Sequence, residues 1–557
     1  MHFLKKGFFM QTSWLVVVPP LVVILLAFLT RKILSSLFCG VFVALLILHK
    51  WVVTDACFAI IVRLWKTTEL GSISSLQTFW QASNLCIMLF LLLVGILIMM
   101  IRSSGGAYAY GNFVMRYLKL PYHAEMATLI LSLFFFIDDY LSSISVGSVM
   151  QTVTDRFQIP RVKLALLVNS MAAPLVVIVP VSSWVAHITM QLKNTGINLE
   201  NTTTTLLIAD PFHMYLRVIP YLFYSFAVIA VLWFIVVRRI SYGTLYKHEE
   251  IAAKTGNLFA GKTSVTQRTR ELSVNELQGS SLADFLVPVG SLFASVALTI
   301  LYFGNWRLFG GNNGFITALR STQIAPALCT AAAMTVFISM LFLVFRKRLT
   351  LVQLPMIILD GIRLMISSVI MLALVWTLSE LLKNDLATGN YLANLFIGQL
   401  NISYFPAVFF LLTAITTTLM GSAWGAISIY IPIALPMLVT LSGVQVPVEL
   451  LALPLMIPLL GAIVSGAVVG NHLSPIADNT LMAATSSGAY VIDVVKSQIS
   501  FTVPIACATA LGYLLAGSMV TAGYASLWVI MCSLSVIIIV SCIYFSLIQL
   551  LKSKRII

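Results

Sequence analysis

Long, unbroken apolar runs dominate this sequence and limit what it can fold into. The run from Leu85 to Ile101 carries no charged side chain, and runs of roughly 20 residues recur along the chain. A helix of about 20 residues spans the hydrocarbon core of a bilayer, which is roughly 30 Å thick. Of the 557 residues, 60% are hydrophobic and only 9% are charged, whereas about a quarter of the residues in soluble domains are charged. A soluble fold is therefore excluded.

The length of these runs also indicates the fold class. Strands of a membrane β-barrel are about 10 residues long and alternate in hydropathy, which these runs do not. They predict an all-α polytopic membrane protein with about 11 to 14 transmembrane helices. Gly, Pro and polar clusters interrupt several runs, and such interruptions in corresponding places of two halves are typical of transporters built from repeats. We therefore expect two inverted repeats with broken helices or re-entrant hairpins.

The positive charge of the chain reports on topology. The formal net charge is +14, and the longest polar stretch, 238–283, holds seven basic residues between Arg238 and Arg270. Because basic loops remain on the cytoplasmic side, we place this loop and the C-terminus in the cytoplasm of a prokaryotic cell, with the protein in the plasma (inner) membrane. The lipid bilayer is then the expected partner, and no nucleic acid is. The predicted regions are an N-terminal helical region with the first repeat (1–237), the cytoplasmic basic loop (238–283) and a C-terminal helical region with the second repeat (284–557).

Two adjacent carboxylates interrupt the apolar run 124–153. Asp138 and Asp139 are followed by four hydroxyl side chains before position 149, which predicts a broken helix. Ionisable groups inside a membrane are costly and therefore mark functional positions. Adjacent side chains point about 100° apart on a helix, so we expect one carboxylate to face a cation and the other to act as a cap or gate. A plain N-cap, or a partner for an arginine, is the alternative.

Small and polar residues surround two prolines in the next run. Such a segment cannot remain one regular helix, and carbonyls freed beside Pro174 and Pro180 could act as ligands. A kinked packing helix explains the prolines almost as well. His187 is placed at the membrane interface. The candidate binding residues here are Asn169, Ser170, Ser182 and Ser183.

The second half contains two comparable interruptions. Segment 416–426 is rich in Gly and hydroxyl side chains, and segment 470–480 is the densest polar group within apolar surroundings. Together they suggest a midplane site of the kind that repeat-built transporters have. The candidate binding residues here are Ser422, Asn471, His472, Ser474, Asp478, Asn479 and Thr480.

These clusters resemble the NhaC family of sodium/proton antiporters, within the inverted-repeat ion transporter group. The resemblance is carried by segments 138–150, 172–184, 386–391, 421–425, 472–478 and 492–496 and covers roughly 120 to 500, most of the chain. It implies sodium/proton exchange by alternating access. It also implies sodium or a proton as coupling ion and no other cofactor.

The chain departs from this family at two positions. Asn169 begins a segment where the family usually has Asp-Ser-Thr, and Asn471 stands where it has Gly-Asp-His. A carboxylate about 4 Å from a monovalent cation contributes about 4 kcal/mol at an effective dielectric constant of about 20, whereas an amide is neutral and cannot exchange a cation for a proton. Asp138, Asp139 and Asp478 are then the strong titratable candidates, and we place a sodium site at Asp478, Asp138, Asn169 and Asn471.

Other function classes remain as alternatives or are excluded. Losing two carboxylates favours, as the alternative, a sodium- or proton-coupled transporter of a small organic solute, an amino acid or a carboxylate. A channel would show a repeated filter-like segment, and a hydrolase would show motifs such as His-Glu-x-x-His or Gly-x-Ser-x-Gly; the sequence has neither. We therefore expect a transporter that is not an enzyme, and a homo-oligomer is compatible with the sequence.

Overall fold

The computed structural model describes most of the chain. The described residues are 14–30, 32–72, 76–115, 118, 120–136, 138–180, 182–199, 205–262, 280–314, 318, 322–396, 401–449 and 452–553. Within them, 11 helices are long and apolar enough to cross a membrane, and Trp14–Ala27 and Ile33–Leu48 are shorter apolar helices. The prediction of an all-α membrane protein with about 11 to 14 spans is confirmed.

The helices of the described residues divide between the two halves of the chain. Those of the first half are α2 (Val18–Thr30), α3 (Ile33–Leu48), α4 (Val53–Thr67), α5 (Leu76–Gln81), α6 (Ser83–Ser103), α7 (Gly106–Met115), α8 (Pro121–Leu133), α9 (Asp139–Arg156), α10 (Arg161–Ile178), α11 (Ser183–Asn194), α12 (Pro211–Val218), α13 (Phe223–Arg238) and α14 (Gly243–Thr255). Those of the second half are α16 (Ala283–Phe303), α18 (Ile324–Phe345), α19 (Leu354–Glu380), α20 (Thr388–Phe396), α21 (Phe405–Met420), α22 (Ala423–Leu441), α23 (Met456–Leu473), α24 (Asp478–Ser486), α25 (Val491–Thr521) and α26 (Ser526–Ser553).

Four helix breaks occur, two in each half. The first half has the pairs α8/α9 and α10/α11, and the second half has α21/α22 and α23/α24. The breaks predicted in segments 134–148, 416–426 and 470–480 are confirmed, and they lie at 134–138, 421–422 and 474–477. Pro174 lies inside α10 without ending it, and this helix ends instead at Ile178, ahead of Pro180.

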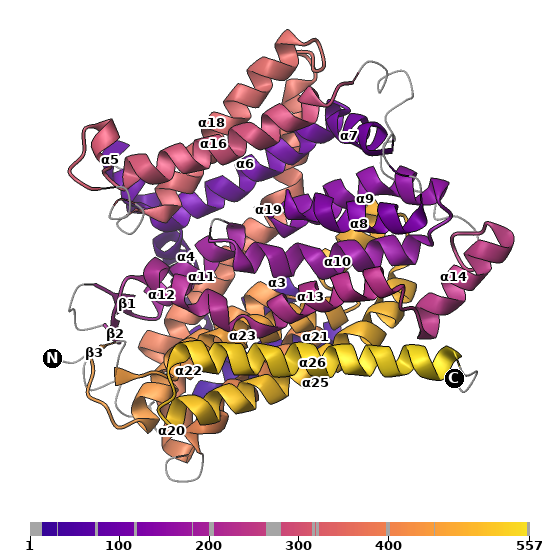
Figure 1. Ribbon diagram of the computed structural model, residues 1–557. Helices are drawn as coiled ribbons and strands as arrows, with labels where there is room; N and C mark the ends of the chain where they lie inside the picture. The colour runs from indigo at the N-terminus through magenta and orange to yellow at the C-terminus, as the bar shows by residue number, and fades with distance from the viewer. Residues whose placement is uncertain are drawn as a thin grey trace.

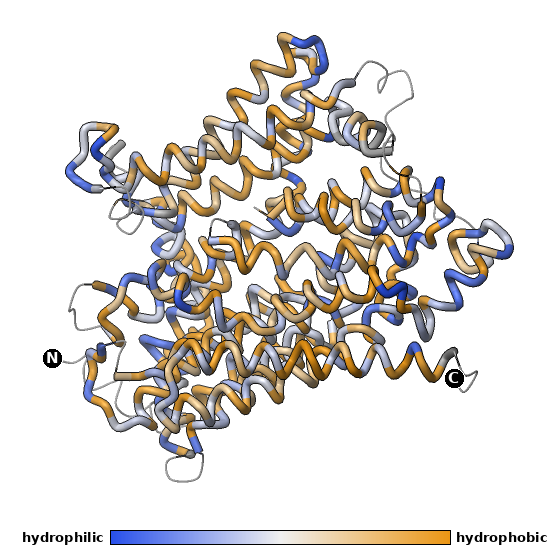
Figure 2. Tube along the Cα trace, viewed as in Figure 1, coloured by the Kyte–Doolittle hydropathy of each residue, from blue (hydrophilic) through white to orange (hydrophobic). Residues whose placement is uncertain are grey.

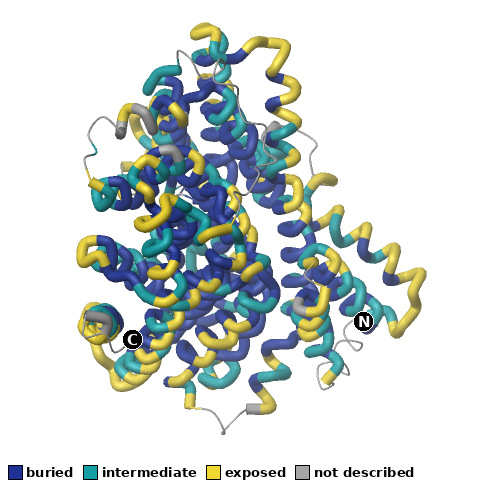
Figure 3. The backbone as a smooth tube through the Cα atoms, turned by 90° about the vertical axis from the view of Figure 1, so that its right-hand side faces the viewer, coloured by how far each residue is buried: buried dark blue, intermediate teal, exposed yellow. Residues whose placement is uncertain are grey.

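The helices form layers that run across Figure 1. Helices α6, α16 and α18 pack together along the upper edge, α8, α9, α10 and α13 lie below them, and α25 and α26 follow the lower edge. Figure 2 shows apolar helix bodies with hydrophilic residues gathered at the helix ends. The buried residues concentrate between the layers, and the outer helix faces are exposed (Figure 3). This is the distribution expected when lipid surrounds the helix bodies.

A small parallel sheet connects the two halves at one end of the molecule. Strands β1 (Ile197–Asn198), β2 (Leu207–Ile208) and β3 (Val448–Glu449) lie in the order β1-β2-β3, at the left of Figure 1. The register pairs Leu207 with both Ile197 and Val448. The connection after α11 is therefore fixed to the connection after α22, although more than 200 residues separate them in sequence.

Helices α21 and α23 pack against each other more closely than side chains normally permit. A Cβ atom on Gly466 would lie 2.4 Å from the carbonyl oxygen of Phe410, and one on Gly470 would lie 2.3 Å from the Cβ of Thr417. Only glycine fits at this spacing. The close contact holds the break after α23 next to the break after α21.

The predicted basic loop contains a helix that is docked on the membrane-spanning bundle. Glu249 of α14 lies 2.6 Å from Lys163, whose ammonium also lies 2.7 Å from Glu125. Lys262, which follows α14, forms an ion pair of 2.6 Å with Asp493 at the start of α25. Segment 243–262 therefore marks one end of the bundle, called the basic-loop end below. Residues 263–279 of the predicted loop lie outside the described part of the chain.

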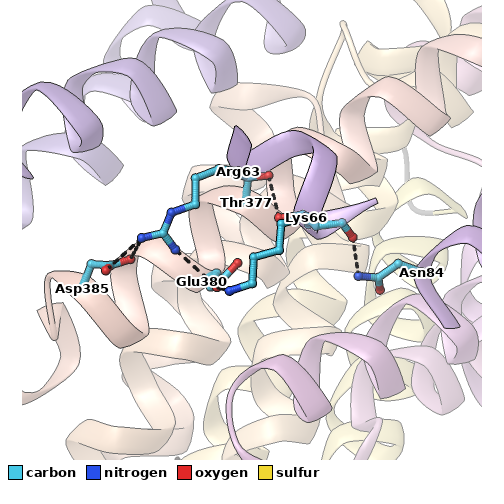
Figure 4. A network of polar contacts seen from close by, with 7 residues as sticks. Arg63, Lys66, Asn84, Thr377, Glu380 and Asp385 are labelled. Carbon is cyan, nitrogen blue, oxygen red and sulfur yellow. Dashed lines mark hydrogen bonds and ion pairs between the residues drawn. The ribbon is translucent and has the colours of Figure 1, made fainter. Parts of the chain in front are cut away.

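The opposite end carries a second group of ion pairs (Figure 4). Arg63 of α4 lies 3.3 Å from Glu380 and 3.0 Å from Asp385, and Lys66 lies 3.3 Å from Glu380. These groups are partly exposed, and Thr377 lies one helical turn further along α19 toward the protein interior. Helix α4 is thereby held against the end of α19.

Candidate functional site

The four helix breaks meet at one cavity with about 250 Å³ of empty space. Its walls come from the beginnings of α9, α11, α22 and α24, from the end of α23 and from the middle of α19. The residues that line it are Asp139, Tyr140, Trp184, Met371, Gly421, Ser422, Ala423, Trp424, Asn471, Asp478 and Asn479. Segments separated by more than 300 residues thus form a single site.

Four helix N-termini border this cavity. Three of them have side-chain caps: Asp138 Oδ1 accepts from the Leu141 amide at 3.0 Å, Ser182 Oγ from the Val185 amide, and Ser422 Oγ from the Gly425 amide. Each N-terminus carries about half a positive charge. Four together offer about two positive charges, which is comparable with the negative charge of the two carboxylates in the cavity wall.

Asp139 is a buried carboxylate with fixed partners. Its Oδ2 accepts a hydrogen bond from Trp184 Nε1 at 2.9 Å and another from Asn479 Nδ2 at 2.6 Å. Its Oδ1 has no hydrogen-bond partner among the described residues, and only 2% of the residue is exposed. The buried, unpaired oxygen is therefore free to accept a proton or a cation.

Asp478 is the exposed carboxylate of the cavity. Tyr140 donates its hydroxyl to Asp478 Oδ2 at 3.1 Å, and this bond joins the first turn of α9 to the first turn of α24. Because part of Asp478 remains accessible, an ion can reach this carboxylate more easily than it can reach Asp139.

The two amides singled out in the sequence, Asn169 and Asn471, occupy different places. Asn471 lines the cavity, whereas Asn169 is fully buried behind it. Asn169 Nδ2 donates to Thr480 Oγ1 at 3.3 Å, and Thr480 Oγ1 donates to the Asn471 carbonyl at 2.9 Å. Behind this layer, Gln498 Nε2 of α25 donates to Ser170 Oγ at 2.9 Å.

The remaining candidates lie outside the cavity wall. Asp138 and Ser182 are caps, and Ser183 is a buried residue in the first turn of α11. His472 Nδ1 lies 2.8 Å from the Tyr224 hydroxyl on α13, and Ser474 is buried at the end of α23. Of the 13 candidates, the structure brings five into the wall: Asp139, Ser422, Asn471, Asp478 and Asn479. The four residues of the predicted sodium site do not gather, since only Asp478 and Asn471 line the cavity.

Sequence reasoning missed part of the wall and misplaced one residue. Tyr140 directly follows the carboxylate pair, so its place in the first turn of α9 was the available signal; Met371 lies in an ordinary apolar stretch and gave none. The interfacial placement of His187 is wrong. It is completely buried, because its ring packs between Trp424 and Trp376.

Two curated proteins resemble the chain. A protein of Haemophilus influenzae described as uncharacterized is 28% identical over 513 residues, which cover 91% of this chain and 92% of that protein. The malate-2H(+)/Na(+)-lactate antiporter of Bacillus subtilis is 30% identical over 118 residues, which cover 20% of this chain and 23% of that protein.

Two solved structures match over most of their length with low similarity. The Alcanivorax borkumensis YdaH transporter has a TM-score of 0.42 at 13% identity, covering 85% of this chain and 90% of that one. Neisseria gonorrhoeae MtrF, described as one of a class of antimetabolite efflux pumps, has a TM-score of 0.37 at 14% identity, covering 88% of this chain and 84% of that one.

A family model identifies the chain. The model for the Na+/H+ antiporter family matches residues 175–518, which is more than half of the sequence and includes three of the four helix breaks. The chain is therefore an integral membrane protein and a secondary transporter, not an enzyme, and it belongs to the Na+/H+ antiporter family.

Proposed function

We propose that the protein exchanges sodium for protons by alternating access through this cavity. The observation that carries the proposal is the meeting of two carboxylates, Asp139 and Asp478, at the convergence of four half-helix N-termini. A carboxylate can hold either a proton or a sodium ion, and competition between the two is the simplest basis of antiport. The enclosed space of the cavity is about that of one water molecule, which suits a small ion such as sodium.

In this proposal the exposed carboxylate receives the ion. Asp478 accepts a single hydrogen bond from Tyr140, so a sodium ion can bind there together with the side-chain oxygen of Asn471. Asp139 lies behind, where its unpaired Oδ1 supplies a second negative oxygen. When protons replace sodium, both carboxylates become neutral, and the cavity closes with less charge on its walls.

One observation favours a second candidate, the coupled transport of a small organic solute. The wall contains amide groups at Asn471 and Asn479 and indole rings at Trp184 and Trp424, next to four positive helix ends. Helix N-termini attract anionic groups, and indoles provide apolar surface for a carbon skeleton. The polar and apolar groups of this wall are the types that bind an amino acid or carboxylate, which would enter with sodium or a proton.

The test is transport by the purified protein in proteoliposomes. A sodium pulse should change the internal pH reported by a dye, and Asp478→Asn should abolish the change. Asp360→Asn is the matched control, because Asp360 is also a carboxylate of a membrane-spanning helix but lies outside the cavity, 3.5 Å from Arg363. Full activity of Asp478→Asn would refute this site. The second candidate would be established by two results together. Sodium would cause no change of internal pH, and a sodium or proton gradient would drive the uptake of radiolabelled amino or dicarboxylic acids.

We also propose that the basic-loop end faces the cytoplasm of a prokaryotic cell. Arg346 and Arg348 lie 2.8 and 3.3 Å from Asp284, so the α18/α19 connection lies at the same end as the start of α16. The rightmost segments of Figure 1 are α14 and the end of α26, at this same end. Gathering of basic residues at one end fits the positive-inside rule. Labelling of single cysteines placed in segment 243–262 by an impermeant thiol reagent, in intact and opened cells, measures the orientation.

A further inference from the structure

An aromatic stack closes the cavity on the side away from the basic-loop end. The ring of His187 lies 5.1 Å from the ring of Trp424 with an angle of 12°, and 6.4 Å from the ring of Trp376 with an angle of 22°. The three rings come from α11, α22 and α19, and Trp424 also lines the cavity. At most 4% of any of the three residues is exposed. The stack therefore excludes water.

Buried polar groups continue from this stack toward the opposite end. His187 Nε2 lies 3.3 Å from Ser428 Oγ, and Gln191 Nε2 donates to the Ser428 carbonyl at 3.4 Å and to Ser379 Oγ at 2.5 Å. Gln191 lies one turn after His187 on α11, and Ser379 directly precedes Glu380 in the ion-pair group of Figure 4. A polar column thus connects the stack with that surface.

The column contains buried polar atoms that make no hydrogen bond while the stack is closed. Gln191 Oε1 and Trp376 Nε1 are buried and have no hydrogen-bond partner among the described residues. Such atoms cost about 1–3 kcal/mol each. Water would hydrogen-bond to both atoms if the stack parted, so hydration of the column would remove this cost.

Among the described residues, no charged side chain is paired with His187 in the closed stack. Helix α22 carries Tyr430 as its single titratable side chain, and α19 carries none between Met371 and Ser379, where Glu380 follows. The ring bonds to Ser428 and to none of the other charged or titratable side chains of α11 and the helices packed on it: Lys193 on α11, Arg161 and Lys163 on α10, Cys86 and Arg102 on α6, Asp360 and Arg363 on α19, and His213, Tyr215 and Arg217 on α12. Asp139 bonds to Trp184 and to Asn479 rather than to the imidazole.

We propose that His187 is a proton-binding residue that controls access to the cavity from the end opposite the basic loop. The neutral ring stacks between the two indoles and closes this end. A proton carried by water that enters the column from this end converts the ring to an imidazolium, which needs hydration that the closed stack does not provide, although the indole faces offset part of the charge. The stack then parts, and it closes again when the proton leaves. This inference rests on the proposed transport function and names the group that couples protons to it.

The test measures access to the column directly. Ser379→Cys places a thiol at the outer end of the column with little change in size, and an impermeant maleimide is added from the side opposite the basic loop. Labelling is normalised to the unfolded protein at each pH and to the chain without this change, because the native Cys57 and Cys507 are exposed. Labelling should rise about tenfold between about pH 8 and about pH 5.5, as expected if the open form binds the proton with the ordinary affinity of a histidine and the closed form binds it about 100 times more weakly.

Variants of the stack separate a proton effect from a packing effect. In His187→Gln the labelling should not depend on pH, and in His187→Phe, which keeps the stack, it should stay low at every pH. Trp376→Leu, which removes one face of the stack, should label at every pH. His213→Gln, a half-buried histidine on α12 outside the column, should keep the normal response.

Two results would overturn the proposal: a pH response retained in His187→Gln, or equal labelling of the parent Ser379→Cys chain at both pH values. The assay contains neither sodium nor solute. If labelling depends on pH but sodium drives no proton flux, the proposed antiport is contradicted and the His187 inference stands. If sodium drives proton flux but labelling does not depend on pH, the His187 inference alone is contradicted.

Discussion

Asp139 and Asp478 line the same cavity, yet their surroundings differ in most physical respects. Asp139 is buried, and Trp184 and Asn479 hold one of its oxygens, whereas Asp478 is exposed and has Tyr140 as its hydrogen-bond donor. A buried carboxylate held by two donors keeps one position, while an exposed one can exchange ions with water. We infer that the two acids have different roles, in which Asp478 meets the ion and Asp139 fixes the charge of the cavity behind it.

Besides the loss expected in Asp478→Asn, the largest effect is expected from Asp139→Asn. Asparagine has nearly the same shape, and its oxygen can still accept from Trp184, but its negative charge is gone. A charge that contributes about 4 kcal/mol to a cation about 4 Å away cannot be replaced, so we expect transport to fall by about 100-fold or more. Sodium-driven proton flux or solute uptake in proteoliposomes measures this loss.

Stability provides the control for this variant. Because the donors to residue 139 remain in place, the unfolding temperature in detergent should change by only a few degrees, roughly the effect of 1 kcal/mol or less in a protein of this size. Equal, partial losses of transport in Asp139→Asn and Asp478→Asn would contradict the difference in roles.

A gain of cation dependence is the next largest effect. Asn471→Asp places a carboxylate in the cavity wall, whereas Asn169→Asp places one behind it, next to Thr480. We expect Asn471→Asp to lower the sodium concentration for half-maximal transport about tenfold, with a smaller effect of Asn169→Asp. A sodium titration of transport in both single variants and the double variant compares them. A larger effect at position 169 would show that Asn169, rather than Asn471, lies next to the bound ion.

Sequence reasoning was sufficient for the membrane class, the span count and three of the break positions. Apolar runs and clustered polar residues are local signals, so they can be recognised in one segment at a time. Sequence reasoning was insufficient to predict which side chains from distant segments meet. Asp138 and Asp139 are equivalent in the sequence, but the cap geometry turns the first toward the Leu141 amide and leaves the second for the cavity.

The same limit explains the error at His187. A single histidine among apolar residues carries no local signal for burial, and the two tryptophans that enclose it belong to α19 and α22, almost 200 residues or more away in sequence. The helix α14 docked within the basic loop was also outside what charge counting shows, because its contacts depend on Lys163 and Asp493 in other segments.

Removing a donor to Asp139 should have an intermediate effect. Asn479→Ala deletes the 2.6 Å hydrogen bond to Asp139 Oδ2 and leaves the Trp184 bond in place. Losing a partner of a buried charge costs about 1–3 kcal/mol, so we expect transport to fall about tenfold and the protein to lose comparable stability. Parallel transport and thermal unfolding measurements separate the two effects. The same loss in Asn479→Leu, which restores most of the volume without an amide donor or a charge, would assign the effect to the hydrogen bond.

The smallest effect is expected from Tyr140→Phe, and this change examines the exposed side of the comparison. The variant keeps the ring and removes the hydroxyl that donates to Asp478 Oδ2 at 3.1 Å. Because Asp478 is exposed, water can take the place of the lost donor, so the carboxylate keeps its charge and its hydration. The hydroxyl also competes with a bound cation for the same oxygen, so its removal offsets the lost positioning. We expect a change of about threefold or less in the half-saturating ion concentration, with the maximal rate unchanged. A loss as large as that of Asn479→Ala would mean that Asp478 is held as rigidly as Asp139, and the two carboxylates would then form one buried pair.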